Sequence, residues 1–264
     1  MELKTDDLNT IKKSINDIAT YVSLYLKLSK ETNIQTKILD GFLNKGISFV
    51  NSIFILTNHN QYGESIILYR CLIERLLFLK YIIENNKYEE YDNWSFVKNY
   101  EQKNTARTFK KYNKNVSSDN LKSSKEDTLK YQNLKKNKPN WKEPDLEKYS
   151  KKIGYGHLYK LGYDFGSSYV HSRSDEGIND FEQNNRLKPK NNPQIISIQY
   201  NSLLVCFSIF DECISNSNLK SLNKINEYKL IIDNYFENKE LLQLSEIEFK
   251  IRDFIFKEAT KNYS

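Results

Sequence analysis

The chain has 264 residues, and its 40 Lys and Arg residues outnumber its 34 Asp and Glu residues, which gives a formal net charge of +6. A chain of this length can bury a core without disulfide or metal staples, and its hydrophobic fraction of 39% is too high for a disordered protein. With only 8 Gly and 4 Pro, it has little material for the tight turns of an all-β fold or for phosphate-cradling loops.

Apolar residues recur at steps of three and four along most of the chain, which predicts a series of amphipathic helices. The predicted helical segments are residues 6–29, 33–57, 61–84, 87–113, 155–171, 194–215, 222–236 and 240–259. The segment 61–84 is apolar on nearly every side, so we expect it at the centre of a bundle. The sequence therefore predicts a single all-α domain over 1–264, a bundle of about seven to nine helices, with a polar loop over 172–193.

Basic charge is concentrated in residues 101–152, which we interpret as an insertion displayed on one side of the bundle. This segment has 15 Lys and Arg residues against 7 Asp and Glu residues, a local charge of +8, while the rest of the chain carries −2. Its stretch 119–136 is a candidate surface helix, although it lacks a continuous apolar stripe. Such a segment suits RNA or another anionic partner, but it is also typical of a solvated surface loop. The candidate phosphate contacts are Lys135, Lys136 and Lys138, and the candidate base-stacking side chains are Tyr112, Tyr131 and Trp141.

The sequence predicts a cytoplasmic protein that does not enter a membrane. The first residues are acidic where a secretory signal has a basic and then an apolar run. Apolar runs such as residues 52–56 and 66–69 are much shorter than the roughly 18 residues of a spanning helix. The cysteines are three in number, lack metal-type spacing and lie in apolar helical patterns, which is typical of buried thiols in a reducing compartment. They are Cys71, Cys206 and Cys213.

Arg70 is the first polar residue that does not fit a core pattern, because it lies in the apolar stripe of the most hydrophobic predicted helix. Glu74 follows one turn later. One interpretation is an i,i+4 ion pair at the edge of the bundle. The alternative is a ligand site, since a charge within such a helix needs a partner or a polar cavity, and Arg suits a planar carboxylate or phosphate.

A second polar group lies at Tyr163, Ser167 and His171, which steps of four place along one helical face. Asp164 and Ser168 lie beside this face. The unperturbed pKa of a histidine, near 6.5, suits proton transfer at neutral pH, and His171 lies where the predicted loop begins. The alternative for His171 is a helix-terminal residue that is hydrogen-bonded to the backbone.

Common enzyme templates are not found in this sequence. It contains no Gly-x-x-x-x-Gly-Lys-Ser/Thr, Gly-x-Gly-x-x-Gly, Gly-x-Ser-x-Gly or His-Glu-x-x-His motif. Three histidines offer few ligands for a metal. We therefore expect neither a metal nor another cofactor.

The spacing of these polar residues resembles that of a known group of proteins. The R-x-x-x-E pair from Arg70 to Glu74, followed by Y-x-x-x-S-x-x-x-H from Tyr163 to His171, resembles a poorly characterised all-helical bacterial family that is similar to the HEPN superfamily. The resemblance covers roughly residues 40–215, and it implies a homodimeric, metal-independent RNase of toxin or phage-defence systems. The usual signature places an Arg four to six residues before the His in one helix. Here Arg173 follows His171 instead, so a catalytic arginine would come from another helix, with Arg70 the candidate.

Two functional hypotheses follow. In the first, His171 is the base toward a ribose 2′-hydroxyl, Arg70 stabilises the charge on the phosphorane, and Tyr163, Ser167 and Glu74 orient them, while Arg173 and the basic segment contact RNA. In the second, the protein is a non-catalytic binding or scaffold protein. The same side chains then form a hydrogen-bond network that fixes helix packing.

Overall fold

The computed structural model describes residues 33–109, 122–137, 141–170 and 193–217, together with Leu230 and part of 8–23. These residues form eight α-helices and one π-helix, besides the helical residues of 8–23, and they contain no strand. The predicted all-α class is thus confirmed. Chain contacts group the described residues into two compact units, one from 1–81 and 144–264 and the other from 82–143.

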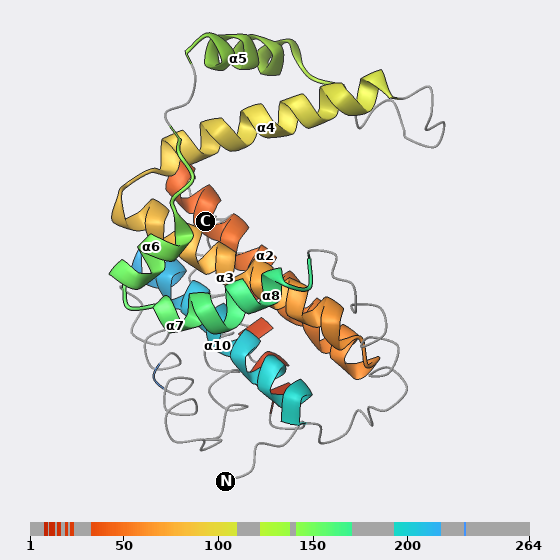
Figure 1. Cartoon of the computed structure of the whole chain (residues 1–264). Coiled ribbons are helices and arrows are strands. Elements are labelled where there is room, and N and C mark those ends of the chain that lie inside the picture. Colours follow the sequence, from red (N-terminus) through yellow and green to blue (C-terminus); the bar gives the residue numbers. More distant parts are fainter. Residues whose placement is uncertain are drawn as a thin grey trace, which may run out of the picture. The chain divides into compact units, whose positions relative to one another are not determined.

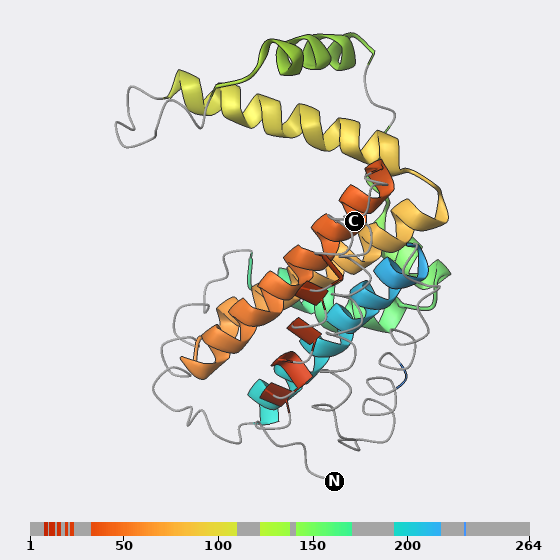
Figure 2. The same cartoon turned by 180° about the vertical axis from the view of Figure 1, so that it is seen from behind.

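The first unit is built on three long helices, which are α2 (Ile34–Asn58), α3 (Tyr62–Glu84) and α10 (Pro193–Ser215). α2 begins where the Asn33 side chain accepts a hydrogen bond from the backbone N–H of Thr36 at 2.8 Å. α2 and α10 lie side by side (Figures 1 and 2). Their starts and ends agree with the predicted segments 33–57, 61–84 and 194–215 to within a residue.

The central position predicted for α3 agrees with its burial. No residue from Ser65 to Ile83 is exposed, and the helix buries apolar side chains on more than one face. The fully buried ones are Leu72, Ile73, Leu76, Leu77, Leu79 and Ile82. Since each buried side chain of this size stabilises the fold by about 1.5–3 kcal/mol, α3 contributes heavily to the core.

α10 is the one described helix whose length and hydropathy match those of a membrane span. Its own packing accounts for that composition. More than half of its most apolar window is buried inside the protein, with Leu203, Cys206 and Ile209 fully buried. A core helix of a bundle has this character as readily as a spanning helix.

The second unit contains α4 (Tyr88–Thr108) and α5 (Lys125–Lys136), which lie side by side (Figure 1). α5 begins with a capping box in which Ser124 Oγ accepts from the backbone N–H of Asp127 at 2.9 Å. No residue of α5 is buried, so the predicted surface helix is present. The rings of Tyr100 and Tyr131 stack at 4.2 Å and join the two helices.

Trp141 corrects one prediction, because its ring is not displayed for stacking on bases. It is 8% exposed, and its ring centroid lies 5.0 Å from that of Tyr91 and 6.1 Å from that of Trp94. A large aromatic ring gains more from burial against other rings than from exposure to water. In the same unit, Tyr131 stacks on Tyr100 instead of being free for a base.

A winding helical segment returns to the first unit after Pro144. It consists of α6 (Leu146–Lys152), α7 (Gly156–Leu158), the π-helix η3 (Tyr159–Asp164) and α8 (Phe165–Ser167), shown in green in Figure 1. α6 begins where Asp145 accepts from the backbone N–H of Lys148. We did not predict α6 or the π-helix, although a helical period over 155–171 was expected.

Several predicted segments can be compared only in part. Described residues of the predicted helix 6–29 are helical, and Leu8, Ile11, Ile15 and Val22 are buried as expected. α4 ends at Thr108, five residues before the predicted end, and residues 110–113 lie outside the described part. The loop 172–193 and the helices 222–236 and 240–259 also lie outside the described residues, apart from Pro193 and Leu230.

Candidate functional site

Arg70 lies in the middle of α3, where it is surrounded by apolar neighbours but retains contact with solvent. Its side chain is 20% exposed. A guanidinium group stays charged at every physiological pH, and burying it without partners costs several kcal/mol. The position therefore demands hydrogen-bond acceptors from a neighbouring element.

The η3–α8 segment supplies two of these acceptors. Arg70 Nε donates to Ser167 Oγ at 2.8 Å, and Arg70 Nη2 donates to the Tyr163 hydroxyl oxygen, also at 2.8 Å. The hydroxyl of Ser167 in turn donates to the backbone carbonyl of Tyr163 at 2.8 Å, which fixes its direction. The predicted shared face of Tyr163 and Ser167 is therefore present, and it faces Arg70.

Glu74 is the third partner of Arg70. Arg70 Nη1 donates to Glu74 Oε2 at 3.3 Å, along the i,i+4 direction of α3, and the Glu74 side chain is 31% exposed. An i,i+4 ion pair that is still reached by solvent contributes little stability by itself. The pair mainly orients the guanidinium, because Glu74 accepts from one terminal nitrogen of Arg70 and Tyr163 accepts from the other.

Two glycines allow the η3–α8 backbone to approach α3 this closely. A Cβ on Gly162 would lie 2.2 Å from Ile73 Cδ1, and a Cβ on Gly166 would lie 2.7 Å from Arg70 Cβ and 3.3 Å from the carbonyl oxygen of Ile66. Both distances below 3.0 Å are contacts that real side chains do not make. The spacing Gly162-x-x-x-Gly166 thus creates the seam in which Tyr163 and Ser167 reach Arg70.

The π-helix lies directly beside this seam. Tyr159–Asp164 forms η3, and the rings of Tyr159 and Tyr163 stack at 5.0 Å. The Tyr163 ring also contacts the guanidinium of Arg70, whose central carbon lies 4.2 Å from the ring centroid. Short π-helical segments are rare in proteins and are often found at functional sites.

Tyr163 is held as a neutral phenol. Burial raises its pKa above the ordinary value, and the nearby charge of Glu74 raises it further, although Arg70 opposes this. At neutral pH the hydroxyl therefore accepts from Arg70 and keeps its own proton. That proton is available to a ligand, since the Tyr163 hydroxyl donates to no described residue.

Four of the five predicted catalytic residues meet in this arrangement, which we call the Arg70 cluster: Arg70, Glu74, Tyr163 and Ser167. The fifth, His171, lies outside the described residues, as do Arg173 and Lys138. Lys135 and Lys136 lie exposed in the last turn of α5, and Lys135 Nζ contacts the Tyr131 hydroxyl at 3.0 Å. Trp141 is buried, as described above.

Sequence reasoning missed the residues that shape the site. Gly162 and Gly166 were not singled out, although a four-residue spacing of glycines in a helical pattern is a recognisable sign of close helix contact. Tyr159 was missed as well, although it precedes Tyr163 by the same step of four residues that groups Tyr163, Ser167 and His171.

Comparison with known proteins places this site within a described family. Residues 36–187 match the family described as "Family of unknown function (DUF5677)". This range includes Arg70, Glu74, Tyr163, Ser167 and His171. Neither the curated proteins nor the solved structures include a match to the chain. Because the matched range covers more than half of its length, the chain belongs to this family of unknown function, DUF5677.

Proposed function

We propose that the protein is an RNA-directed, metal-independent endoribonuclease of a HEPN-like kind, acting in defence or as a toxin. The observation that carries the proposal is the held guanidinium of Arg70. Three of its nitrogens each donate to a protein partner, at 2.8, 2.8 and 3.3 Å. A guanidinium has five N–H bonds, so each terminal nitrogen keeps one for an anionic ligand.

The chemistry follows from this geometry and from the sequence. A planar guanidinium with fixed orientation can bind two oxygens of one phosphate. In the proposed reaction, the ribose 2′-oxygen forms a bond to phosphorus and the bond from phosphorus to the 5′-oxygen breaks. His171 takes the proton of the 2′-hydroxyl, and Arg70 stabilises the charge that develops on the phosphoryl oxygens. The leaving 5′-oxygen needs a proton, which Tyr163 is able to donate.

The place of His171 in this proposal rests on the sequence. It follows Ser167 by four residues, as Ser167 follows Tyr163. The Tyr163 and Ser167 side chains both contact Arg70. α8 ends at Ser167 and a turn follows it over 168–170, so His171 is close enough along the chain to approach the same guanidinium. Exposed lysines of the basic segment, such as Lys135 and Lys136, support RNA binding through phosphate contacts.

The proposal is tested with the purified full chain, a single-stranded RNA and a chelator such as EDTA. We expect cleavage in EDTA, and no cleavage when the ribose at the cleaved position is replaced by deoxyribose, because the 2′-hydroxyl is the nucleophile. His171→Ala should abolish cleavage with little change in melting temperature. The matched control is His59→Ala, since His59 is an exposed histidine at the end of α2 and lies outside the cluster.

Arg70→Lys separates charge from geometry, because lysine keeps the positive charge but cannot bind two oxygens in one plane. We expect binding of RNA to persist and cleavage to fall by at least about 100-fold, as for loss of one oxyanion donor. If the wild-type chain neither cleaves nor binds single-stranded RNA at low salt, the proposal is wrong. The network that fixes α3 against η3–α8 in a non-catalytic scaffold protein is then the better account of the cluster.

A further inference from the structure

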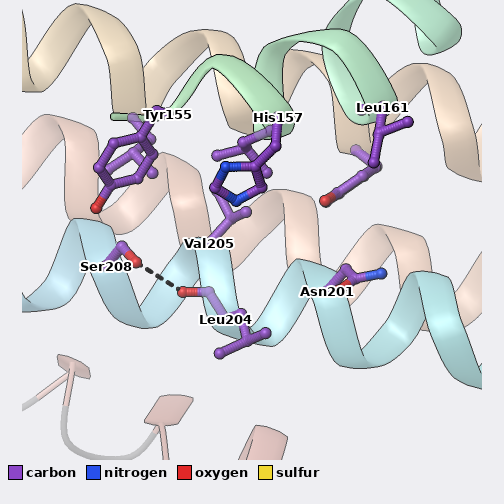
Figure 3. A pocket seen from close by; sticks show the side chains of 11 residues that line it. Tyr155, His157, Leu161, Asn201, Leu204, Val205 and Ser208 are labelled. Carbon is purple, nitrogen blue, oxygen red and sulfur yellow. Dashed lines mark hydrogen bonds between the residues drawn. The ribbon is translucent and has the colours of Figure 1, made fainter. Parts of the chain in front are cut away.

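A pocket of about 310 Å³ lies between the α7–η3 segment and α10, apart from the Arg70 cluster (Figure 3). Tyr155 and His157 face it from one wall, and Asn201 and Ser208 face it from α10 on the opposite wall. Tyr69 of α3 completes this polar set. The volume is at the lower end of the range for small-molecule sites, so it suits a group the size of a single aromatic base.

The described lining of the pocket has no acidic side chain and no lysine or arginine. Its apolar surface comes from branched aliphatic side chains, which are Leu76, Leu158, Leu161, Leu204 and Val205. An ionised ligand group would lose its hydration here without a counter-charge. The occupant should therefore be neutral inside the pocket, with flat apolar faces and polar edges.

Several polar groups in the pocket have no hydrogen-bond partner among the residues that the structure describes. Among the described residues, neither the Tyr69 hydroxyl nor the His157 imidazole has a hydrogen-bond partner. Burial raises the pKa of Tyr69 to about 12, so its hydroxyl remains a neutral donor. Ser208 donates to the carbonyl of Leu204 at 3.0 Å, which leaves its oxygen free to accept.

Asn201 provides the most specific signal. Its Nδ2 donates to Ser197 Oγ at 3.3 Å, which uses one of its two N–H bonds. The Oδ1 atom and the second N–H have no partner among the described residues. A carboxamide with one free acceptor and one free donor pairs with an edge that offers the complementary donor and acceptor. Adenine offers this combination at N6 and N7.

We propose that this pocket binds an unpaired adenine base, with Asn201 pairing to its N6 and N7 edge and the leucine side chains covering its faces. The base can come from a free nucleoside or from a single-stranded RNA. Proteins commonly recognise RNA bases that are splayed out of a stack, and hydrogen bonds to the base edges give the specificity. The inference goes beyond RNA cleavage, and it does not depend on whether the Arg70 cluster cleaves RNA.

Calorimetric titration of the full chain with adenosine tests the proposal. We expect saturable binding of adenosine with a dissociation constant below about 1 mM, the weak end of useful affinity. Asn201→Leu keeps the size of the side chain but removes both hydrogen-bonding atoms, so affinity should fall about tenfold or more. Ser197→Ala is the matched control, since Ser197 Oγ accepts from one N–H of the same carboxamide and Ser197 does not line the pocket.

A second variant keeps the test decisive if Asn201→Leu fails to fold. Tyr69→Phe removes only a hydroxyl that has no described partner, and it should weaken adenosine binding about threefold or more. No saturable binding of adenosine overturns the proposal. Equal affinity for uridine overturns it too, because a pocket that fits the N6 and N7 edge of a purine should hold the smaller pyrimidine ring less well. Full affinity in both Asn201→Leu and Tyr69→Phe likewise overturns it.

The source of the base is decided by comparing adenosine with a short single-stranded oligoadenylate. Tighter binding of the oligomer, lost in Asn201→Leu, identifies an RNA strand as the occupant, whereas equal affinity identifies the free nucleoside. The outcome is separable from that of the cleavage assay. Adenosine binding without RNA cleavage refutes only the endoribonuclease, and cleavage without adenosine binding refutes only the adenine pocket.

Discussion

The Nη2 atom of Arg70 lies 2.8 Å from the hydroxyl oxygen of Tyr163, although 93 residues separate them along the chain. The same guanidinium holds Ser167 and Glu74. The Arg70 side chain therefore fixes η3 and α8 against α3, just before the segment that leads to His171. The chemistry proposed for this site and the stability of this seam depend on the same contacts.

Removing the two hydroxyls that contact Arg70 should reveal coupling between them. Tyr163→Phe and Ser167→Ala should each lower the free energy of unfolding by about 0.5–1.5 kcal/mol. Because both act through Arg70, the double variant should differ from the sum by about 0.5 kcal/mol or more. Urea denaturation gives the free energy of unfolding of the wild type, the two single variants and the double variant. Tyr159→Phe is the control, since the Tyr159 hydroxyl bonds to no described residue, and strict additivity would contradict the shared network.

Gly166→Ala should destabilise the protein, because the added methyl group would lie 2.7 Å from Arg70 Cβ and 3.3 Å from a backbone oxygen of α3. Overpacking of this kind costs about 1–3 kcal/mol. Gly41→Ala is the matched control in α2, where an added Cβ meets nothing within 4 Å. It should stabilise the helix by about 0.5–1 kcal/mol. Thermal and urea denaturation compare the two, and equal effects would rule out the close approach.

The stability of the fold should fall in alkaline solution, partly through Tyr69. Burial raises its pKa from 10.0 to about 12, so the folded state binds the phenolic proton more tightly than the unfolded state does. The contribution is complete below pH 10 and is lost as the pH rises to 12, with an upper bound of about 2–3 kcal/mol. Tyr69→Phe should therefore lose less stability than wild type between pH 10 and 12 in urea denaturation. If the free energy of unfolding fell equally with pH in wild type and Tyr69→Phe, Tyr69 would not be buried as described.

Thiol labelling should distinguish the three cysteines. Cys206 and Cys213 are 0% exposed, and burial raises the pKa of Cys206 to about 12 and that of Cys213 well above its ordinary value. Cys71 is only partly buried. Since the thiolate is the reactive form, an aromatic disulfide reagent should label Cys71 first in the folded protein and all three thiols after unfolding. Cys71→Ser should remove the fast reaction, and a second fast thiol would contradict the packing of α10.

Much of the helical architecture could be predicted because apolar residues recur along the chain at the spacing of an α-helix. The segments 33–57, 61–84 and 194–215 differ from the observed α2, α3 and α10 by a residue at most. Continuous apolar periods specify both the helix and its burial. α6 was missed because seven residues with four charges show no apolar period, and its start depends on the cap at Asp145.

The sequence alone also determined that Arg70 and Glu74 share one helix and that Tyr163 and Ser167 share another face, since a four-residue step fixes both. Only the tertiary structure decided that these two pairs meet. That meeting depends on the absence of a Cβ at Gly162 and Gly166, and on the π-turn, neither of which follows from local periodicity. The burial of Trp141 was likewise decided by the tertiary structure, which packs its ring against Tyr91. The charged sequence around Trp141 does not indicate that its ring is buried.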